Sequence, residues 1–169
     1  MLKKKIITTI LLFFFNFSFL HANENIVYMD FNYVINNSSI GKKVLDELNK
    51  LNKKNIENLN SHQIKLRKEM EEINKIRNIA SADDMKKKIS IHNQNIKEYD
   101  NLKKRLSDEL NKKRNDEMNK LVKLINPLLE NYMEENSIDI ILNKEIVYFA
   151  KDKYDISKDI LNLTNNNYK

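Results

Sequence analysis

The sequence Ile79-Ala80-Ser81-Ala82-Asp83-Asp84 decides how the long central part of this chain folds. On both sides of it, apolar residues recur at three- and four-residue steps, which is the period of a helix with one apolar face. Ser81 followed three residues later by Asp84 matches the capping-box pattern that starts a helix. We therefore predict that the chain reverses at residues 80–84 and forms an antiparallel helical hairpin. One uninterrupted helix through this point is the alternative.

The two arms of the predicted hairpin run from Lys42 to Ile79 and from Met85 to Asn126. At 1.5 Å per residue, each arm would reach on the order of 50 Å. The apolar positions of the first arm are Val44, Leu45, Leu48, Leu51, Ile56, Leu59, Leu66, Met70, Ile73, Ile76 and Ile79. Those of the second are Met85, Ile89, Ile96, Tyr99, Leu102, Leu106, Leu110, Met118, Leu121 and Ile125. Because Asn52, Asn55 and Gln63 lie near the stripe, we expect a loosely packed coiled coil.

The only glycine and the only proline lie at the two joints of the predicted arm. Gly41 follows a polar bend at residues 36–39 and opens the first helix. Pro127 lies inside the returning helical pattern, where its missing amide hydrogen should kink the helix or end one segment. We expect Pro127 to be the bend at which the arm enters the base, with a helix-breaking loop as the other interpretation.

Short β-prone segments flank the predicted arm. Residues 26–31 predict one strand, and residues 138–142 and 146–150 predict two more, joined by the polar turn 143–145 into a hairpin. Residues 155–157 can cap a last short helix. Since no other strand is predicted, the first strand must pair with this hairpin. The fold class we expect is mainly α, with a small β-sheet base that carries the long hairpin.

Such a base has reasons to associate with copies of itself. A small sheet has open edges, and a two-helix coil with amides in its seam is marginally stable. Closing several copies around an axis would pair the edges and bury the apolar side chains. We assign residues 23–41 and 127–169 to this oligomerisation body, and 42–126 to the arm. The residues expected between the copies are Val27, Met29, Ile140, Ile141, Val147 and Phe149.

The first 22 residues have the pattern of a cleavable export signal. Lys3, Lys4 and Lys5 form a positive start, residues 6–20 are mostly apolar, and Ala22 offers a small residue for cleavage. A retained anchor is the alternative, but the apolar run falls short of the roughly 20 residues that span a bilayer. Zero cysteines exclude a lipoprotein attachment site and a disulfide framework. We expect an exported chain.

The charge pattern gives little support to a nucleic-acid binder. The formal net charge is +6, but without the three signal lysines the chain has 27 basic and 24 acidic side chains, or +3. These charges are interleaved, as on a solvated helix surface, although the pI is 9.3. A contact with anionic lipid headgroups stays open.

No motif in the sequence indicates catalysis. One glycine cannot build a Gly-rich phosphate-binding loop. His62 and His92 lie on opposite predicted arms, and no carboxylate or cysteine surrounds either at metal-ligand spacing. We therefore expect exposed or seam-flanking histidines, no enzyme activity, no metal and no cofactor.

The chain resembles the Skp/OmpH family of periplasmic chaperones over essentially its whole length after the signal. The pieces that carry the resemblance, in order, are Tyr28-Met29-Asp30, Ser39-Ile40-Gly41-Lys42, the low-complexity helical arms, residues 137–142 with Val147-Tyr148, and Asp155-Ile156-Ser157. Their order and spacing are more specific than any one of them. The glycine-free tip at residues 80–83 and the low alanine content of the arms depart from the family.

The resemblance implies a periplasmic homotrimer whose strands form a central barrel. Three helical hairpins would then surround a cavity that holds unfolded outer-membrane β-barrel proteins without ATP. Anionic lipid or lipopolysaccharide is a further candidate partner, and the individual client-contact residues within the arms are not given by the sequence. A structural or adaptor coiled-coil protein of an envelope assembly is the alternative function.

Overall fold

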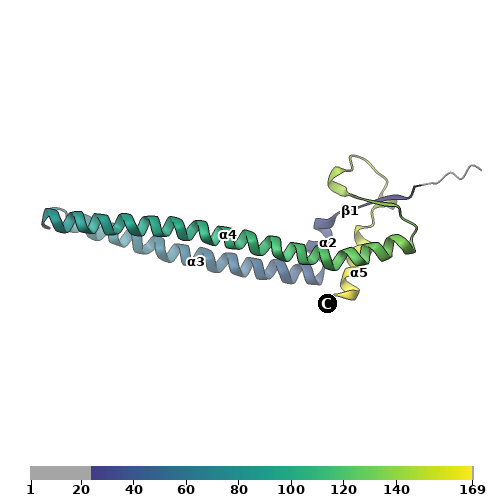
Figure 1. Ribbon diagram of the computed structural model, residues 1–169, viewed down its shortest axis with the longest axis horizontal. Coiled ribbons are helices and arrows are strands. Elements are labelled where there is room, and N and C mark those ends of the chain that lie inside the picture. The colour runs from purple at the N-terminus through teal and green to yellow at the C-terminus, as the bar shows by residue number, and fades with distance from the viewer. Residues whose placement is uncertain (1–23, 169) are drawn as a thin grey trace, which may run out of the picture.

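The computed structural model describes residues 24–168, so the predicted signal at residues 1–22 lies outside the described residues. A long two-helix arm projects from a small base that also holds both ends of the described chain (Figure 1). The elements in chain order are β1 (Ile26–Met29), α2 (Phe31–Asn37), α3 (Ser39–Ile76), α4 (Ala82–Glu135), β2 (Ile140–Asn143), the 3₁₀ turns η1 (Lys144–Ile146) and η2 (Asp152–Tyr154), and α5 (Ser157–Asn167).

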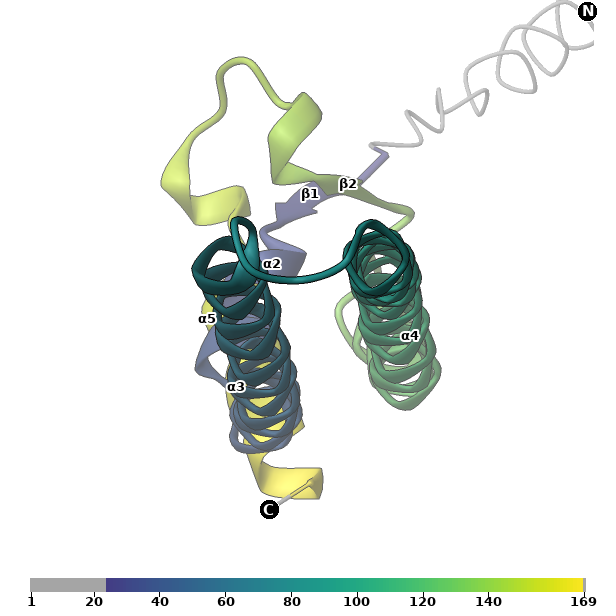
Figure 2. The ribbon, with the colours of Figure 1, turned by 90° about the vertical axis from the view of Figure 1, so that its left-hand side faces the viewer.

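The arm is an antiparallel pair formed by α3 and α4. These helices have 38 and 54 residues, which correspond to about 57 Å and 81 Å at 1.5 Å per residue. Viewed from the tip in Figure 2, they lie side by side with one short connection between them. Ser81 caps α4: its Oγ accepts a hydrogen bond from the Asp84 amide at 3.1 Å and donates one to Asp84 Oδ2 at 2.7 Å. The chain therefore reverses, and the alternative of one uninterrupted helix is wrong.

Of the two interpretations of Pro127, the helix-breaking loop is wrong. The helix continues through Pro127 to Glu135, and this last part packs against the base. Pro127 is exposed, so its ring lies toward solvent. In the turn before it, the Leu124 carbonyl accepts a hydrogen bond from the Tyr168 hydroxyl at 3.1 Å. The C-terminal end of the chain thus braces α4 where a proline weakens the helical ladder.

Residues 31–37, which include part of the expected polar bend, form the short helix α2 instead. Asp30 accepts a hydrogen bond from the Tyr33 amide at 2.8 Å and starts α2, and Ser38 accepts one from the Gly41 amide at 3.1 Å and starts α3. Gly41 is needed for close approach: a Cβ built on it would lie 1.9 Å from the Ile35 carbonyl oxygen. Only a residue without a side chain fits where α2 meets α3.

The sheet of the base has two parallel strands. β1 pairs with β2 in the register Ile26↔Ile140 to Met29↔Asn143. The predicted hairpin is wrong, because residues 144–146 form η1 and residues 147–149 are not a strand. The other edge of β1 is already occupied by Asp155, which bridges Tyr28, and by the Ile156 amide, which donates to the Tyr28 carbonyl at 3.0 Å. Residues 146–150 therefore cannot pair with β1, and they do not pair with β2 either, whose outer edge stays open within residues 24–168.

The hydrophobic core lies in the base and not along the arm. Its buried members come from β1, α2, the base end of α4, the connection from α4 to β2, and α5 with the residue just before it: Val27, Met29, Val34, Ile35, Leu121, Ile125, Ile138, Ile156 and Ile160. Along the arm beyond the base, few of the described side chains are buried, and two of these, His92 and Glu117, are polar. The base thus anchors an arm whose two helices bury few apolar side chains between them.

Candidate functional site

A loop of residues 144–156 projects from the base beside the arm (Figures 1 and 2). Within this loop, Tyr148 is fully exposed, Phe149 is 90% exposed and Ile146 is 73% exposed. Single exposed apolar residues are ordinary, but three within four positions make this loop a candidate interaction site.

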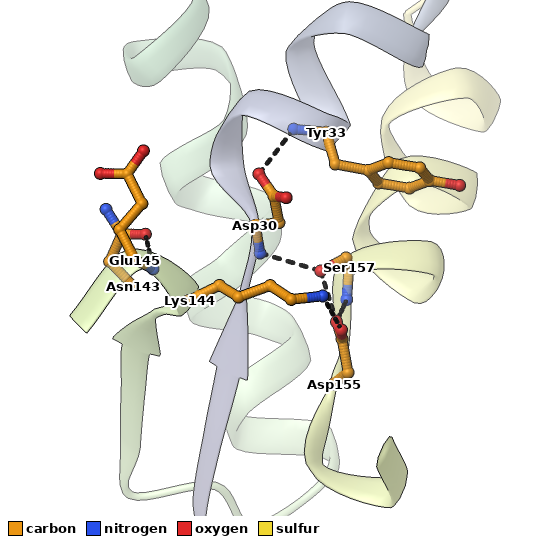
Figure 3. A network of polar contacts seen from close by, with 7 residues as sticks. All are labelled: Asp30, Tyr33, Asn143, Lys144, Glu145, Asp155 and Ser157. Atoms are coloured by element: carbon orange, nitrogen blue, oxygen red, sulfur yellow. Dashed lines mark hydrogen bonds and ion pairs between the residues drawn. The ribbon is translucent and has the colours of Figure 1, made fainter. Parts of the chain in front are cut away.

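Hydrogen bonds and an ion pair hold the two ends of this loop together (Figure 3). Lys144 Nζ lies 2.8 Å from Asp155 Oδ2 and also lies over the Tyr28 ring, 5.7 Å from its centroid. Asp155 Oδ1 accepts hydrogen bonds from the amide and the hydroxyl of Ser157, and Ser157 Oγ accepts one from the Asp30 amide at 2.8 Å. Burial opposes ionisation of Asp155, but these donors outweigh it and hold its pKa below the ordinary value. These contacts between Lys144, Asp155, Ser157 and Asp30 therefore fix the two ends of the loop to the base.

Beside β2, the base has an apolar hollow of about 500 Å³. Its apolar lining comprises Met29, Phe31, Leu129, Met133, Ile140, Ile141 and Leu142. The residues assigned to the oligomerisation body thus occupy different places: Val27 and Met29 are core residues, Ile140 and Ile141 line the hollow, and Val147 and Phe149 belong to the projecting loop.

Near the tip of the arm, a polar cluster interrupts the seam. His92 is 5% exposed, and its Nδ1 lies 3.1 Å from Glu69 Oε2 on the other helix. Since a carboxylate only accepts, Nδ1 donates in this contact. Asn95 Nδ2 donates to both oxygens of Glu69, at 3.0 and 3.1 Å. Hydrogen bonds from Asn95 and His92 lower the pKa of Glu69 below its ordinary value.

This cluster goes beyond what the sequence analysis found for His92. The sequence places Glu69 23 residues away from His92, and only the register of the hairpin brings them together. His62 is half-buried and lines a neighbouring hollow with Glu69 and Asn95. Within residues 24–168, no group of three or more histidine, cysteine or acidic side chains could hold a metal ion.

We expect Glu69→Gln to lower the melting temperature of the arm at pH 7 and to have little effect in acid. Because the folded pKa is lowered, the ionised form of Glu69 stabilises the folded arm above its unfolded pKa of about 4.3, and this stabilisation is lost as the pH falls through the lower folded pKa. Melting followed by circular dichroism at pH 7 and pH 3 measures the difference. The exposed Glu57→Gln is the control. An equal effect of Glu69→Gln at both pH values would contradict the cluster.

A two-helix arm projecting from a small mixed base is the fold of the OmpH-like proteins. The family model described as outer membrane protein (OmpH-like) matches residues 25–163, so the chain belongs to the OmpH-like family. The resemblance found in the sequence is thereby confirmed.

A solved structure from Caulobacter crescentus CB15, described as a candidate outer membrane chaperone (OmpH-like), superimposes with a TM-score of 0.77. It is 13% identical in sequence, and the match covers 88% of each chain. At this identity the similarity shows the shared fold. A search of curated protein sequences found no match. Among the helices of residues 24–168, none combines the length and the apolar character needed to cross a membrane.

Proposed function

We propose that this chain is a periplasmic holdase chaperone that keeps unfolded outer-membrane β-barrel proteins from aggregating, without ATP. The observation that carries the proposal is the projecting α3–α4 arm in a chain of the OmpH-like family. The arm buries few of its apolar side chains, so half-exposed aliphatic residues are available for many weak contacts. Many weak contacts in one enclosure give avidity while each exchanges quickly, so release needs no nucleotide.

We further propose that three copies associate through their bases and enclose the client between their arms. The outer edge of β2 has no partner within residues 24–168, and such an edge invites pairing with another chain. The β-prone residues 146–149 lie in the same base outside any strand; Ile146, Tyr148 and Phe149 are exposed, and Val147 is half-buried. If they join β2 of the neighbouring copy, the contact is heterologous and closes into a ring. Phe149 and Val147 would then contact Ile140 and Ile141 of the next copy, above a core that includes Val27 and Met29.

The charges of the two parts of the chain differ in sign. Residues 42–126 contain 22 basic and 14 acidic side chains, a formal net charge of +8. Residues 23–41 and 127–169 contain 5 basic and 10 acidic side chains, a net charge of −5. A positive arm attracts acidic segments of a client and speeds their capture at low salt. The same charge makes the arm the candidate contact for anionic lipid or lipopolysaccharide.

The proposal predicts that the purified chain, without its first 22 residues, suppresses aggregation when a urea-unfolded outer-membrane β-barrel protein is diluted into buffer without nucleotide. Turbidity measures the suppression, and a protein of similar size without apolar arms serves as the control. If the client aggregates as fast as in the control, the holdase assignment is wrong. The alternative of an adaptor in an envelope assembly would then be favoured, with one specific folded partner in a defined ratio.

A further inference from the structure

One side of the arm has an apolar groove beside the polar cluster. The groove has a volume of about 760 Å³ and reaches His92 at its inner side. Its aliphatic lining is Ile64, Leu66, Met70 and Ile96. Asn60, Gln63 and Arg67 complete the lining with two uncharged amides and one positive charge.

The polar cluster explains why these aliphatic side chains are left outside the seam. Glu69 and Asn95 occupy seam positions, and Met70 and Ile96 each follow one of them in the sequence. One residue is about 100° around a helix, so Met70 and Ile96 lie beside the seam and not in it. Ile64 is also nearly half exposed. Three large apolar side chains, Ile64, Met70 and Ile96, therefore stay partly exposed along one groove.

We propose that this groove binds a short extended segment of the unfolded client, with apolar side chains on one face and a carboxylate next to them. This inference rests on the proposed holdase function and names the contact site within the arm. Residues 60–70 of α3 span about 15 Å, which matches four to five residues of extended chain at about 3.3 Å each. Alternate side chains of such a segment point to the same face, as in the strands of an outer-membrane barrel.

The polar lining fits the rest of such a segment. Asn60 and Gln63 can both donate to and accept from the unpaired backbone groups of an extended chain. Arg67 can bind a carboxylate, since its contact with Glu71 is 3.9 Å long and both side chains are largely exposed. Another arm is a poor occupant, because each arm carries a net charge of +8 and two arms repel.

The opposite side of the arm offers a matched control. Ile91 is 50% exposed and lies with Glu72 and Lys88 in a different hollow. Ile91 and Ile96 are five positions apart, which is about 140° around α4. The two side chains are therefore of the same type and similar exposure, but they lie on different sides of the same helix.

The test compares Ile96→Ser with Ile91→Ser in the full mature chain, using a fluorescently labelled, urea-unfolded outer-membrane barrel protein as the probe. We expect Ile96→Ser to raise the client Kd about threefold to tenfold and Ile91→Ser to change it less than twofold. The double variant Ile64→Ser with Ile96→Ser should have a larger effect. In parallel, a photo-crosslinking residue should attach to the client from position 96 and not from position 91. Circular dichroism checks that the helices are retained.

Two results would overturn the inference, and they can be told apart. If the parent chain binds the client but both single variants weaken binding equally, or both positions crosslink equally, the groove is not the contact site and the holdase function stands. If the parent chain does not bind the client at all, the holdase function and the groove assignment both fail.

Discussion

Replacing Gly41 with alanine is expected to destabilise the protein by about 3 kcal/mol, which corresponds to a fall of roughly 10 °C in Tm. Two effects of this change oppose each other. Alanine is a better helix former than glycine by about 1 kcal/mol, and Gly41 lies in the first turn of α3. Its methyl group, however, would lie 1.9 Å from the carbonyl oxygen of Ile35, which belongs to backbone and cannot rotate away. The clash outweighs the gain in helix propensity, because α2 and α3 must move apart to relieve it. The net effect is therefore a loss of stability.

The control for this change is Lys42→Ala, at the next position of the same helical turn. Lys42 is exposed, so its replacement changes helix propensity without a clash. Thermal melting followed by circular dichroism compares the two variants with the parent chain. An unchanged or higher Tm for Gly41→Ala would show that the close approach of α2 to α3 is wrong.

Replacing Ile140 with aspartate is expected to separate the proposed trimer into single chains and to abolish holding activity. Ile140 is the first residue of β2, is 40% exposed and lines the apolar hollow, so one chain can tolerate a charge there. In the proposed assembly, the same side chain is buried against the loop of a neighbouring copy. An unpaired charge in such an interface costs several kcal/mol. Because the interface repeats in each copy, the penalty is paid three times in one ring.

Light scattering measures the mass of this variant, and circular dichroism measures its helix content. Ile56→Asp is the control, since Ile56 is similarly exposed but lies on the arm. We expect the parent mass for Ile56→Asp, the mass of one chain for Ile140→Asp, and the same helix content for both. An unchanged mass for Ile140→Asp would show that the base does not form the proposed trimer interface.

The features that the sequence predicted correctly are those with local signals. The 3.6-residue period predicted the two arms, and Ser81 with Asp84 predicted where the second one begins. Residues 26–29 and 140–143 also form strands near the predicted places. Helix α2 was missed because seven residues are too few to show a period.

The features that the sequence did not predict depend on contacts between distant residues. Residues 146–150 have the composition of a strand, but β propensity mostly reflects packing against a partner, and within residues 24–168 they pair with neither β1 nor β2. The pairing of His92 with Glu69 depends on the register between the arms. Pro127 lies inside α4 with its ring exposed, and the Tyr168 hydroxyl donates to the Leu124 carbonyl three residues before it. The spacing of residues in the sequence reveals neither the missing partner of residues 146–150, nor the His92–Glu69 pair, nor the surroundings of Pro127.

The most direct test of the holdase account is the mass of the complex that forms when a urea-unfolded outer-membrane β-barrel protein is diluted into the mature chain without nucleotide. Size-exclusion chromatography with light scattering separates the complex from aggregates and free chains. The account predicts a soluble complex of three chains with one client, in which the client has no native strand content. A client that aggregates regardless of the chain, or a complex that forms only with the folded barrel, would contradict it.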